Sequence, residues 1–284
     1  MNSVLELLRR VLLRPYVLDV IRDAEEARAA SVATLGEARV QLRLAAVALL
    51  IIAGLMVVRF AGNESELKWV VGLLDALGLD AQAKSFAKVV DPKNADAQLW
   101  RKVWWAAARV VGYGLVPLAL AKTVSGLSLR ELGLGLGDLR KHMKVYLLLF
   151  AIMMPTIFAA SFGAGFQAKY PYYKLAANEP LWPTFYTWEL LYAANFAALE
   201  FFFRGFAVRA LRPFMGYGSI FAMMIPYAMI HFGKPLPEAI GSVITGFVLG
   251  TLSIKHKSIW GGVFLHVSAA CSMDFYALWH TGRL

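Results

Sequence analysis

Four ionisable side chains stand in apolar stretches of this sequence, where a charged group is costly. Glu200 and Arg204 are four residues apart in the run ALEFFFRGF, and His231 and His266 follow in two later apolar segments. A carboxylate can accept a proton from water, one imidazole can hold that water, and another can donate to a developing oxyanion. Such a set of residues could hydrolyse a peptide bond without a covalent intermediate.

Residues four apart on a helix share a face, so Glu200 and Arg204 can pair directly. Desolvation makes a carboxylate more basic and a neighbouring guanidinium opposes this effect. The balance would leave Glu200 able to take a proton from water. The alternative is an interfacial salt bridge in which Arg204 extends to the membrane surface and the pair is only structural.

The composition places these residues in a membrane protein. Of 284 residues, 59% are hydrophobic and 17% are charged, against about 25% charged in soluble domains, and the mean hydropathy is +0.56. Clustered apolar runs of this kind predict an all-α, polytopic transmembrane helix bundle. We expect about seven spans, possibly eight, near residues 42–61, 103–121, 145–164, 184–206, 216–232, 239–254 and 258–278.

Residues 1–41 form a separate N-terminal segment in this interpretation, and residues 42–284 form the transmembrane domain. The stretch 19–43 is expected to be an amphipathic helix on the membrane surface. Residues 63–98 are expected to be a loop with an amphipathic segment at 67–79. Basic residues fall in alternate connections, at the N-terminus and near 122–144, 204–212 and 255–257, which predicts that these lie in the cytoplasm and the C-terminus outside. The net charge of +10 then indicates contact with anionic headgroups of the bilayer rather than nucleic acid.

Several other features bear on cofactors and packing. The single cysteine, Cys271, excludes an intrachain disulfide and a CxxC metal site. The glycine pattern in LGLGLGD is not expected to be a phosphate loop, because no strand precedes it. Gly261 and Gly262 would permit close helix approach. We expect no cofactor and no metal.

Two further acids lie in apolar segments, and the loop charges predict different membrane depths for Glu200 and His231. Glu189 lies three turns before Glu200, about 16 Å along a helix, and Asp274 either marks the outer end of the last span or points into the same cavity. Loop charges place Glu200 near the cytoplasmic end of its span and His231 near the outer end of the next. A helix that continues past Arg204 would place Glu200 deeper.

Three segments in order resemble the CPBP family, also called the Abi or CAAX-protease family. Its first motif, EExxxR followed by Gly, corresponds to LEFFFRG from Leu199. An aromatic residue, three residues and a histidine correspond to Tyr227 and His231, and HxxxN or HxxxD corresponds to HVSAA from His266. The resemblance covers about residues 180–280 and implies a polytopic intramembrane endopeptidase of glutamic type.

The resemblance also implies roles. Glu200 and His231 would activate water, Arg204 would hold Glu200, and His266 would stabilise the oxyanion. The substrate would be a membrane-embedded or lipid-anchored protein or peptide cut near its C-terminus, such as a prenylated tail, a peptide precursor or a sorting signal. The composition looks bacterial, which favours sorting or maturation in a bacterial cytoplasmic membrane over a prenylated substrate. The usual first glutamate is here Leu199, and the polar residue four after the last histidine is Ala270.

Three alternatives follow from these departures and from the residue types. The first is a catalytically inactive relative that acts as an immunity factor or scaffold. The second is a carrier, although no repeated halves with matched broken helices are found. The third is a zinc-dependent membrane protease that uses Glu200, His231 and His266, although no HExxH motif supports it.

Overall fold

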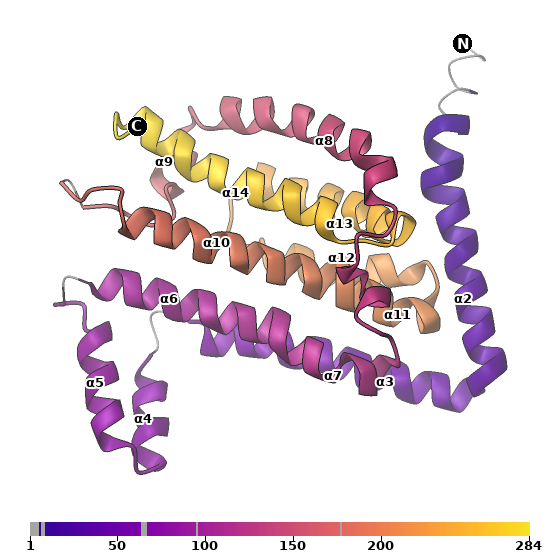
Figure 1. Ribbon diagram of the computed structural model, residues 1–284, viewed down its shortest axis with the longest axis horizontal. Helices are drawn as coiled ribbons and strands as arrows, with labels where there is room; N and C mark the ends of the chain where they lie inside the picture. The colour runs from indigo at the N-terminus through magenta and orange to yellow at the C-terminus, as the bar shows by residue number, and fades with distance from the viewer. Residues whose placement is uncertain (1–5, 7–8, 64–66, 95, 177) are drawn as a thin grey trace. The chain divides into compact units, whose positions relative to one another are not determined.

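The computed structural model describes residues 6, 9–63, 67–94, 96–176 and 178–284, and every regular element in these ranges is helical (Figure 1). The predicted all-α fold is therefore confirmed. In chain order the elements, with π-helical segments labelled η, are η1 (Arg9–Leu18), α2 (Asp19–Leu35), α3 (Glu37–Met56), η2 (Val57–Ala61), α4 (Lys68–Ala76), α5 (Asp80–Val90), α6 (Ala97–Arg109), η3 (Val110–Leu115), α7 (Val116–Ser125), η4 (Arg130–Leu134), α8 (Leu139–Ala160), α9 (Ala164–Lys169), α10 (Thr184–Glu200), η5 (Phe201–Ala207), α11 (Val208–Met215), α12 (Gly218–Met229), α13 (Leu236–His256) and α14 (Trp260–His280).

Five of the described helices are long and apolar enough to cross a membrane, which supports a multi-pass membrane protein. Gly218–Met229 is a shorter apolar helix, and α14 has 21 residues but is not among the five. The count of seven spans stays a prediction. The five long helices are Glu37–Ala61, Ala97–Ser125, Arg130–Ala160, Thr184–Met215 and Leu236–His256.

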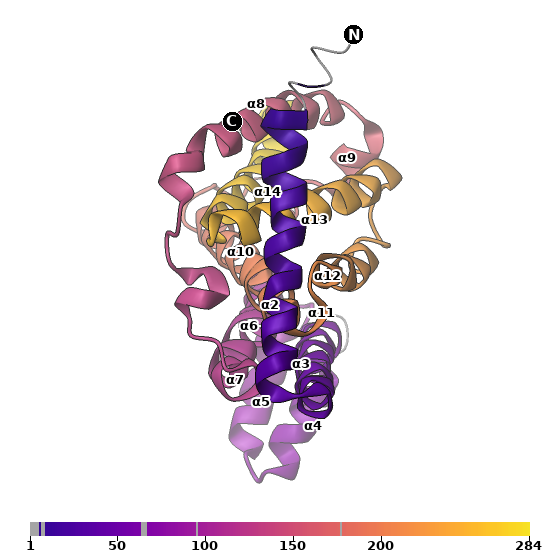
Figure 2. The same ribbon diagram turned by 90° about the vertical axis from the view of Figure 1, so that its right-hand side faces the viewer.

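The chain divides into two compact units, and the first comprises residues 1–52, 116–150 and 200–265. In this unit α2 packs against α11, and α12 packs against both α11 and α13. Figure 2 shows α2 with α11 and α12 beside it. Val20 and Ala24 bury the inner face of α2, and the backbone amide of Tyr217 donates to Glu25 Oε1 at 2.9 Å. The predicted amphipathic helix is thus present, although it ends at Leu35, before Gly36 with its φ of 77°.

The second unit comprises residues 53–115, 151–199 and 266–284. The predicted loop at 63–98 is wrong over much of its length, because α4 and α5 form a packed helical pair there. Leu67, Val70 and Val90 form the buried cluster between them. The amphipathic segment predicted at 67–79 agrees with α4, which begins at Lys68. An apolar face that can be covered by a neighbouring helix explains why this stretch is not an open loop.

The predicted fourth span is longer than expected. Elements α10, η5 and α11 form one continuous helix, Thr184–Met215, of 32 residues. Glu200 stands at the last residue of α10, near the middle of this helix. The helix continues past Arg204, as the alternative prediction had it, and Glu200 lies away from both of its ends. The depths of Glu200 and His231 in the membrane stay predictions.

Candidate active site

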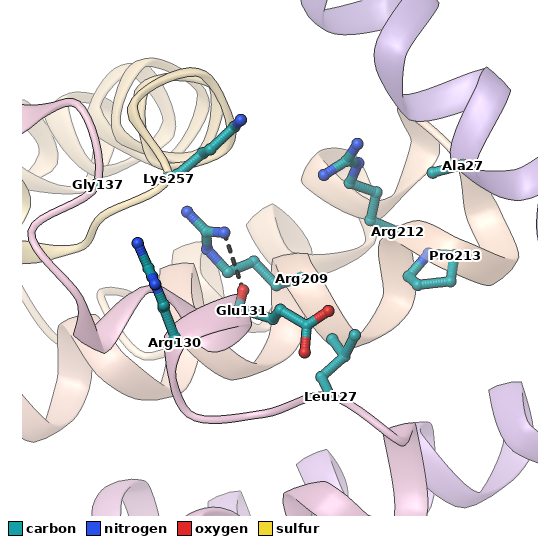
Figure 3. A pocket seen from close by; sticks show the side chains of 9 residues that line it. All are labelled: Ala27, Leu127, Arg130, Glu131, Gly137, Arg209, Arg212, Pro213 and Lys257. Carbon is teal, nitrogen blue, oxygen red and sulfur yellow. Dashed lines mark hydrogen bonds between the residues drawn. The ribbon is translucent and has the colours of Figure 1, made fainter.

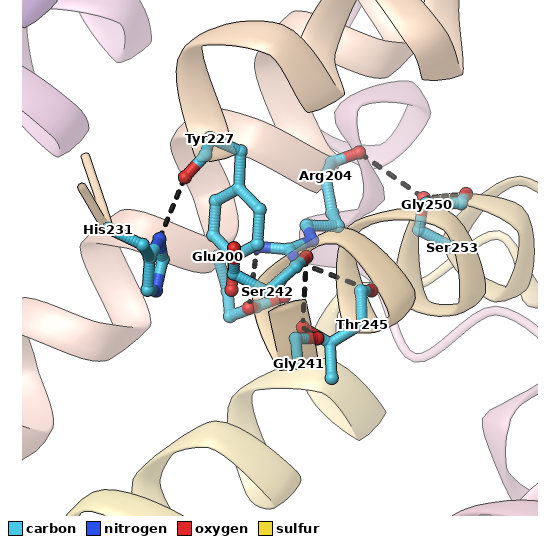
Figure 4. Close-up of polar contacts among 9 residues, drawn as sticks. All are labelled: Glu200, Arg204, Tyr227, His231, Gly241, Ser242, Thr245, Gly250 and Ser253. Carbon is cyan, nitrogen blue, oxygen red and sulfur yellow. Dashed lines mark hydrogen bonds and ion pairs between the residues drawn. The ribbon is translucent and has the colours of Figure 1, made fainter. Parts of the chain in front are cut away.

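Glu200 and Arg204 form the ion pair that their spacing predicted. Arg204 Nη1 lies 3.0 Å from Glu200 Oε1, and the side chains are 1% and 0% exposed. The two atoms are at hydrogen-bonding distance but not in hydrogen-bonding alignment, so the contact is mainly ionic. Arg204 lies in the π-helical segment η5, and such segments are frequent at functional sites. Figure 4 shows the pair between α12 and α13.

The two helices beside the pair hold Arg204 from both sides. The ring of Tyr227, on α12, lies 4.0 Å from Arg204 Cζ, a cation–π contact. On α13, Arg204 Nη2 donates to the Thr245 carbonyl at 3.5 Å, and Ser253 Oγ donates to the Arg204 carbonyl at 3.4 Å. The guanidinium is therefore fixed by an aromatic face, a carboxylate and backbone, so it cannot extend to the surface as the salt-bridge alternative supposed.

His231 lies next to the same aromatic ring. Its imidazole is 4.9 Å from the Tyr227 ring, centroid to centroid, and its Nδ1 is 2.8 Å from the Tyr227 carbonyl (Figure 4). A carbonyl oxygen can only accept, so Nδ1 carries the hydrogen in this contact. In the neutral ring Nε2 is then the acceptor nitrogen, which is the tautomer a water-holding histidine needs. Tyr227 thus connects His231 with Arg204.

Glycines make room for the ion pair at two places. A Cβ at Gly262 would lie 2.5 Å from Glu200 Oε2, and a Cβ at Gly205 would lie 2.9 Å from the Leu132 carbonyl. A Cβ at Gly261 would lie 2.2 Å from the Tyr146 ring. The predicted close approach at Gly261 and Gly262 is therefore confirmed, and the glycine of the first motif allows η4 to contact η5.

The variant Gly262→Ala is expected to lower the free energy of unfolding by about 1–3 kcal/mol, the usual cost of overpacking. The added methyl group must displace the Glu200 carboxylate from its place beside Arg204. Gly241→Ala, with nothing within 4 Å of its Cβ position, is the matched control and should gain up to about 1 kcal/mol from helix propensity. Unfolding in mixed micelles measures both, and equal stability of the two variants would contradict this account.

His266 belongs to the second unit and is described there. Its ring lies 4.5 Å from that of Phe196, centroid to centroid. Leu199 and Ala270, the two departures from the family motifs, are also in this unit and are buried. The structure thus brings together Glu200, Arg204 and His231 in one unit. The role of His266 stays a prediction.

Asp274 and Glu189 are buried in the second unit as well. Asp274 Oδ1 accepts from the backbone amide of Tyr172 at 2.8 Å, and Oδ2 accepts from Trp188 Nε1 at 3.2 Å. Asp274 therefore ties the 170–173 segment to α10, which is a structural use of its carboxylate. Glu189 lines a cavity of about 520 Å³ together with Cys271.

The first unit contains a second polar cluster that was not predicted from the sequence. His256 Nδ1 is 2.9 Å from the Tyr146 hydroxyl, and the His142 and His256 rings stack at 4.0 Å. Tyr146 is also the ring that contacts Gly261. His256 stands between Lys255 and Lys257, so a pattern-based reading assigns it to a charged connection, and only the fold reveals that its side chain is buried.

Within the described ranges, no group of three or more His, Cys, Asp or Glu side chains is placed to hold a metal ion. Residues 181–272 match the family model described as Type II CAAX prenyl endopeptidase Rce1-like. No curated protein and no solved structure matches the chain. The family match confirms the resemblance that the three motifs predicted, and its range contains Glu200, Arg204, His231 and His266.

Proposed function

We propose that this protein is an intramembrane endopeptidase that hydrolyses a peptide bond of a membrane-embedded or lipid-anchored protein or peptide. The observation that carries the proposal is the buried cluster of Glu200, Arg204, Tyr227 and His231, which lies inside the segment that matches an endopeptidase family. A buried ion pair is weak evidence for stability alone. An acid held between a guanidinium and a glycine backbone, with a histidine in the turn just after α12, suits catalysis.

In the proposed reaction Glu200 is the general base. Its carboxylate accepts a proton from a water molecule that is also hydrogen-bonded to His231 Nε2, and the hydroxide oxygen bonds to the carbonyl carbon of the substrate. His266 donates to the oxyanion that forms. The carbon–nitrogen bond then breaks, and the proton on Glu200 passes to the leaving nitrogen. Arg204 positions Glu200 and takes no part in proton transfer.

The substrate class follows from the family description and from the membrane setting. The matched family is described as CAAX prenyl endopeptidases, so cleavage near the C-terminus of a protein held at the membrane is proposed. We propose a sorting or peptide-maturation substrate in a bacterial cytoplasmic membrane rather than a prenylated one. No cofactor is required for this chemistry.

A histidine substitution tests the mechanism. His231→Asn retains an N–H that can donate to the Tyr227 carbonyl but removes the acceptor at the Nε2 position, so cleavage should fall about 10²-fold. The full chain is reconstituted in liposomes with two probes, a farnesylated tetrapeptide tail and an unprenylated peptide on a transmembrane anchor, and products are measured by mass spectrometry. His280→Gln, whose side chain can still contact Ser161 Oγ as His280 Nε2 does at 2.8 Å, is the control.

Wild-type rates from His231→Asn would contradict the assignment of His231. The same assay separates the water mechanism from the zinc alternative. Cleavage that survives 1,10-phenanthroline supports the glutamate mechanism, whereas loss on chelation and recovery with Zn²⁺ supports the metal. The choice of probe that is cut tells prenylated from unprenylated substrates.

A non-enzymatic membrane protein is the second candidate, and specific observations favour it. Leu199 and Ala270 replace two polar residues of the family motifs and are buried, and Glu200 is 0% exposed. A scaffold or immunity factor would use the Glu200–Arg204 pair to hold three helices together. Its cellular phenotype would survive Glu200→Gln, whereas that of a protease would not.

A further inference from the structure

A cationic pocket lies in the first unit, outside the candidate active site. It is a cavity of about 400 Å³ (Figure 3). Four of its lining side chains are cationic and one, Glu131, is a carboxylate; the cations are Arg130, Arg209, Arg212 and Lys257. None of the residues assigned to catalysis lines it. An excess of positive charge around a cavity suits an anion.

Arg209 lines this pocket, and hydrogen bonds hold its guanidinium in place. It is 6% exposed, its Nη1 donates to the Glu131 carbonyl at 2.9 Å, and its Nη2 donates to the Ser253 carbonyl. Its Nε is buried and has no hydrogen-bond partner among the described residues. A buried guanidinium held only by carbonyl oxygens keeps its full charge uncompensated, which is costly unless an anion joins it.

The neighbouring groups leave that charge in place. Arg212 Nη2 also donates to a carbonyl, that of Asp23, at 3.0 Å. The Glu131 carboxylate accepts from the amide and hydroxyl of Ser128, at 2.8 and 2.6 Å, as a capping box. The one carboxylate of the pocket is therefore bound to its own helix start rather than to an arginine.

The glycine-rich segment LGLGLGD, to which the sequence assigned no site, forms part of this pocket. A Cβ at Gly133 would lie 2.9 Å from Arg209 Nε, and one at Gly137 would lie 2.3 Å from the His256 carbonyl. The Asp138 amide donates to that same carbonyl at 2.8 Å. These contacts fix the segment against the turn that carries Lys257, whose φ is 53°. The pocket is thus built by backbone that admits only glycine at these points.

We propose that this pocket binds a phosphate group, as carried by an anionic lipid headgroup or by free phosphate. Planar guanidinium groups such as those of Arg130 and Arg212 suit a phosphate's oxygens. The four cations come from three of the basic segments, 122–144, 204–212 and 255–257, that the charge pattern places in the cytoplasm, where anionic headgroups concentrate. The proposed phosphate site does not depend on the proposed endopeptidase activity.

The pocket also has a mechanical connection to the ion pair. Arg209 lies nine residues after Glu200, about 13 Å along a helix. Ser253 contacts both regions, because its hydroxyl donates to the Arg204 carbonyl and its own carbonyl accepts from Arg209. An anion in the pocket would therefore stabilise the turn of α13 that supports Arg204, and binding should raise the unfolding temperature.

The experiment uses the full chain in two arms. In one, nanodiscs of phosphatidylcholine with 20% phosphatidylglycerol are compared with pure phosphatidylcholine, and retained lipid is counted by native mass spectrometry. In the other, inorganic phosphate is titrated into protein in neutral detergent and the unfolding temperature is followed. Arg130→Gln/Lys257→Gln removes two exposed cations of the pocket, and Arg140→Gln/Lys144→Gln makes the same charge change on exposed residues outside it.

We expect the pocket double variant to weaken binding by about 30-fold, the loss expected for two cations near a membrane surface, and the control double variant to bind as the wild type does. Arg209→Gln should weaken binding as well. Because Arg209 is buried, that variant could also lose its fold, so the test depends on the exposed residues Arg130 and Lys257. Binding in the nanodisc arm alone identifies a lipid headgroup, and binding in the phosphate arm alone identifies a soluble ligand; both support the site. Equal weakening by the two double variants, or binding in neither arm, would overturn it.

Discussion

Glu200→Gln is expected to lower the rate of peptide cleavage by about 10²–10⁴-fold, the usual contribution of a general base. Glutamine keeps the shape of the side chain, and its amide oxygen can still face Arg204, but it cannot take a proton from water. The loss should therefore fall on kcat, with little change in KM or in helical content. Rates are measured in proteoliposomes, with circular dichroism on the same preparation.

Two companion variants make this result specific. Glu238→Gln makes the same chemical change in a half-buried acid paired with Lys234, and it should cleave at the wild-type rate. Leu199→Glu/Glu200→Gln moves the acid to the position the family uses. Cleavage by this variant would show that residue 199 can also hold the base, as the family motif implies, and would leave Glu200 as the base of the wild type. Cleavage by Glu200→Gln itself at the wild-type rate would show that Glu200 is not the base.

The sequence could predict those contacts that join residues close together in the chain. The ion pair of Glu200 with Arg204 and the contact of Tyr227 with His231 are both i,i+4 relations, fixed by one helical turn. Long apolar runs likewise predict membrane helices, because the N–H and C=O groups of a lipid-facing backbone must form their hydrogen bonds within the helix. Those features were confirmed without any knowledge of tertiary packing.

Features that join distant segments could not be predicted in the same way. The Tyr227 ring over Arg204 depends on how α12 crosses η5, and the burial of His256 depends on α8. The contacts that Gly133 and Gly137 make with atoms from other helices also depend on packing. Helix α5 was missed because its hydrophobic residues are sparse and balanced by charges, so that only packing against α4 shows their purpose.

Arg204→Met is expected to lower the free energy of unfolding by about 3–5 kcal/mol, because it leaves the buried Glu200 carboxylate without its cation. Methionine fills much of the volume of the arginine stem, so cavity formation contributes little to this loss. The Tyr227 ring also loses its cation–π contact, which adds to the cost. Reversible unfolding in micelles of increasing sodium dodecyl sulfate content measures the change.

The double variant Glu200→Met/Arg204→Met decides whether the pair exists for stability or for function. Removing both charges removes both desolvation costs, so its stability should return to the wild-type value or exceed it by about 1–4 kcal/mol, while cleavage is lost. Lys141→Met, which breaks an exposed pair with Asp138, should leave the stability close to that of the wild type, because exposed ion pairs contribute little. A double variant as unstable as Arg204→Met would mean that the pair is structural. An ion pair that can be replaced by apolar residues without loss of stability, but not without loss of cleavage, is one retained for its chemistry.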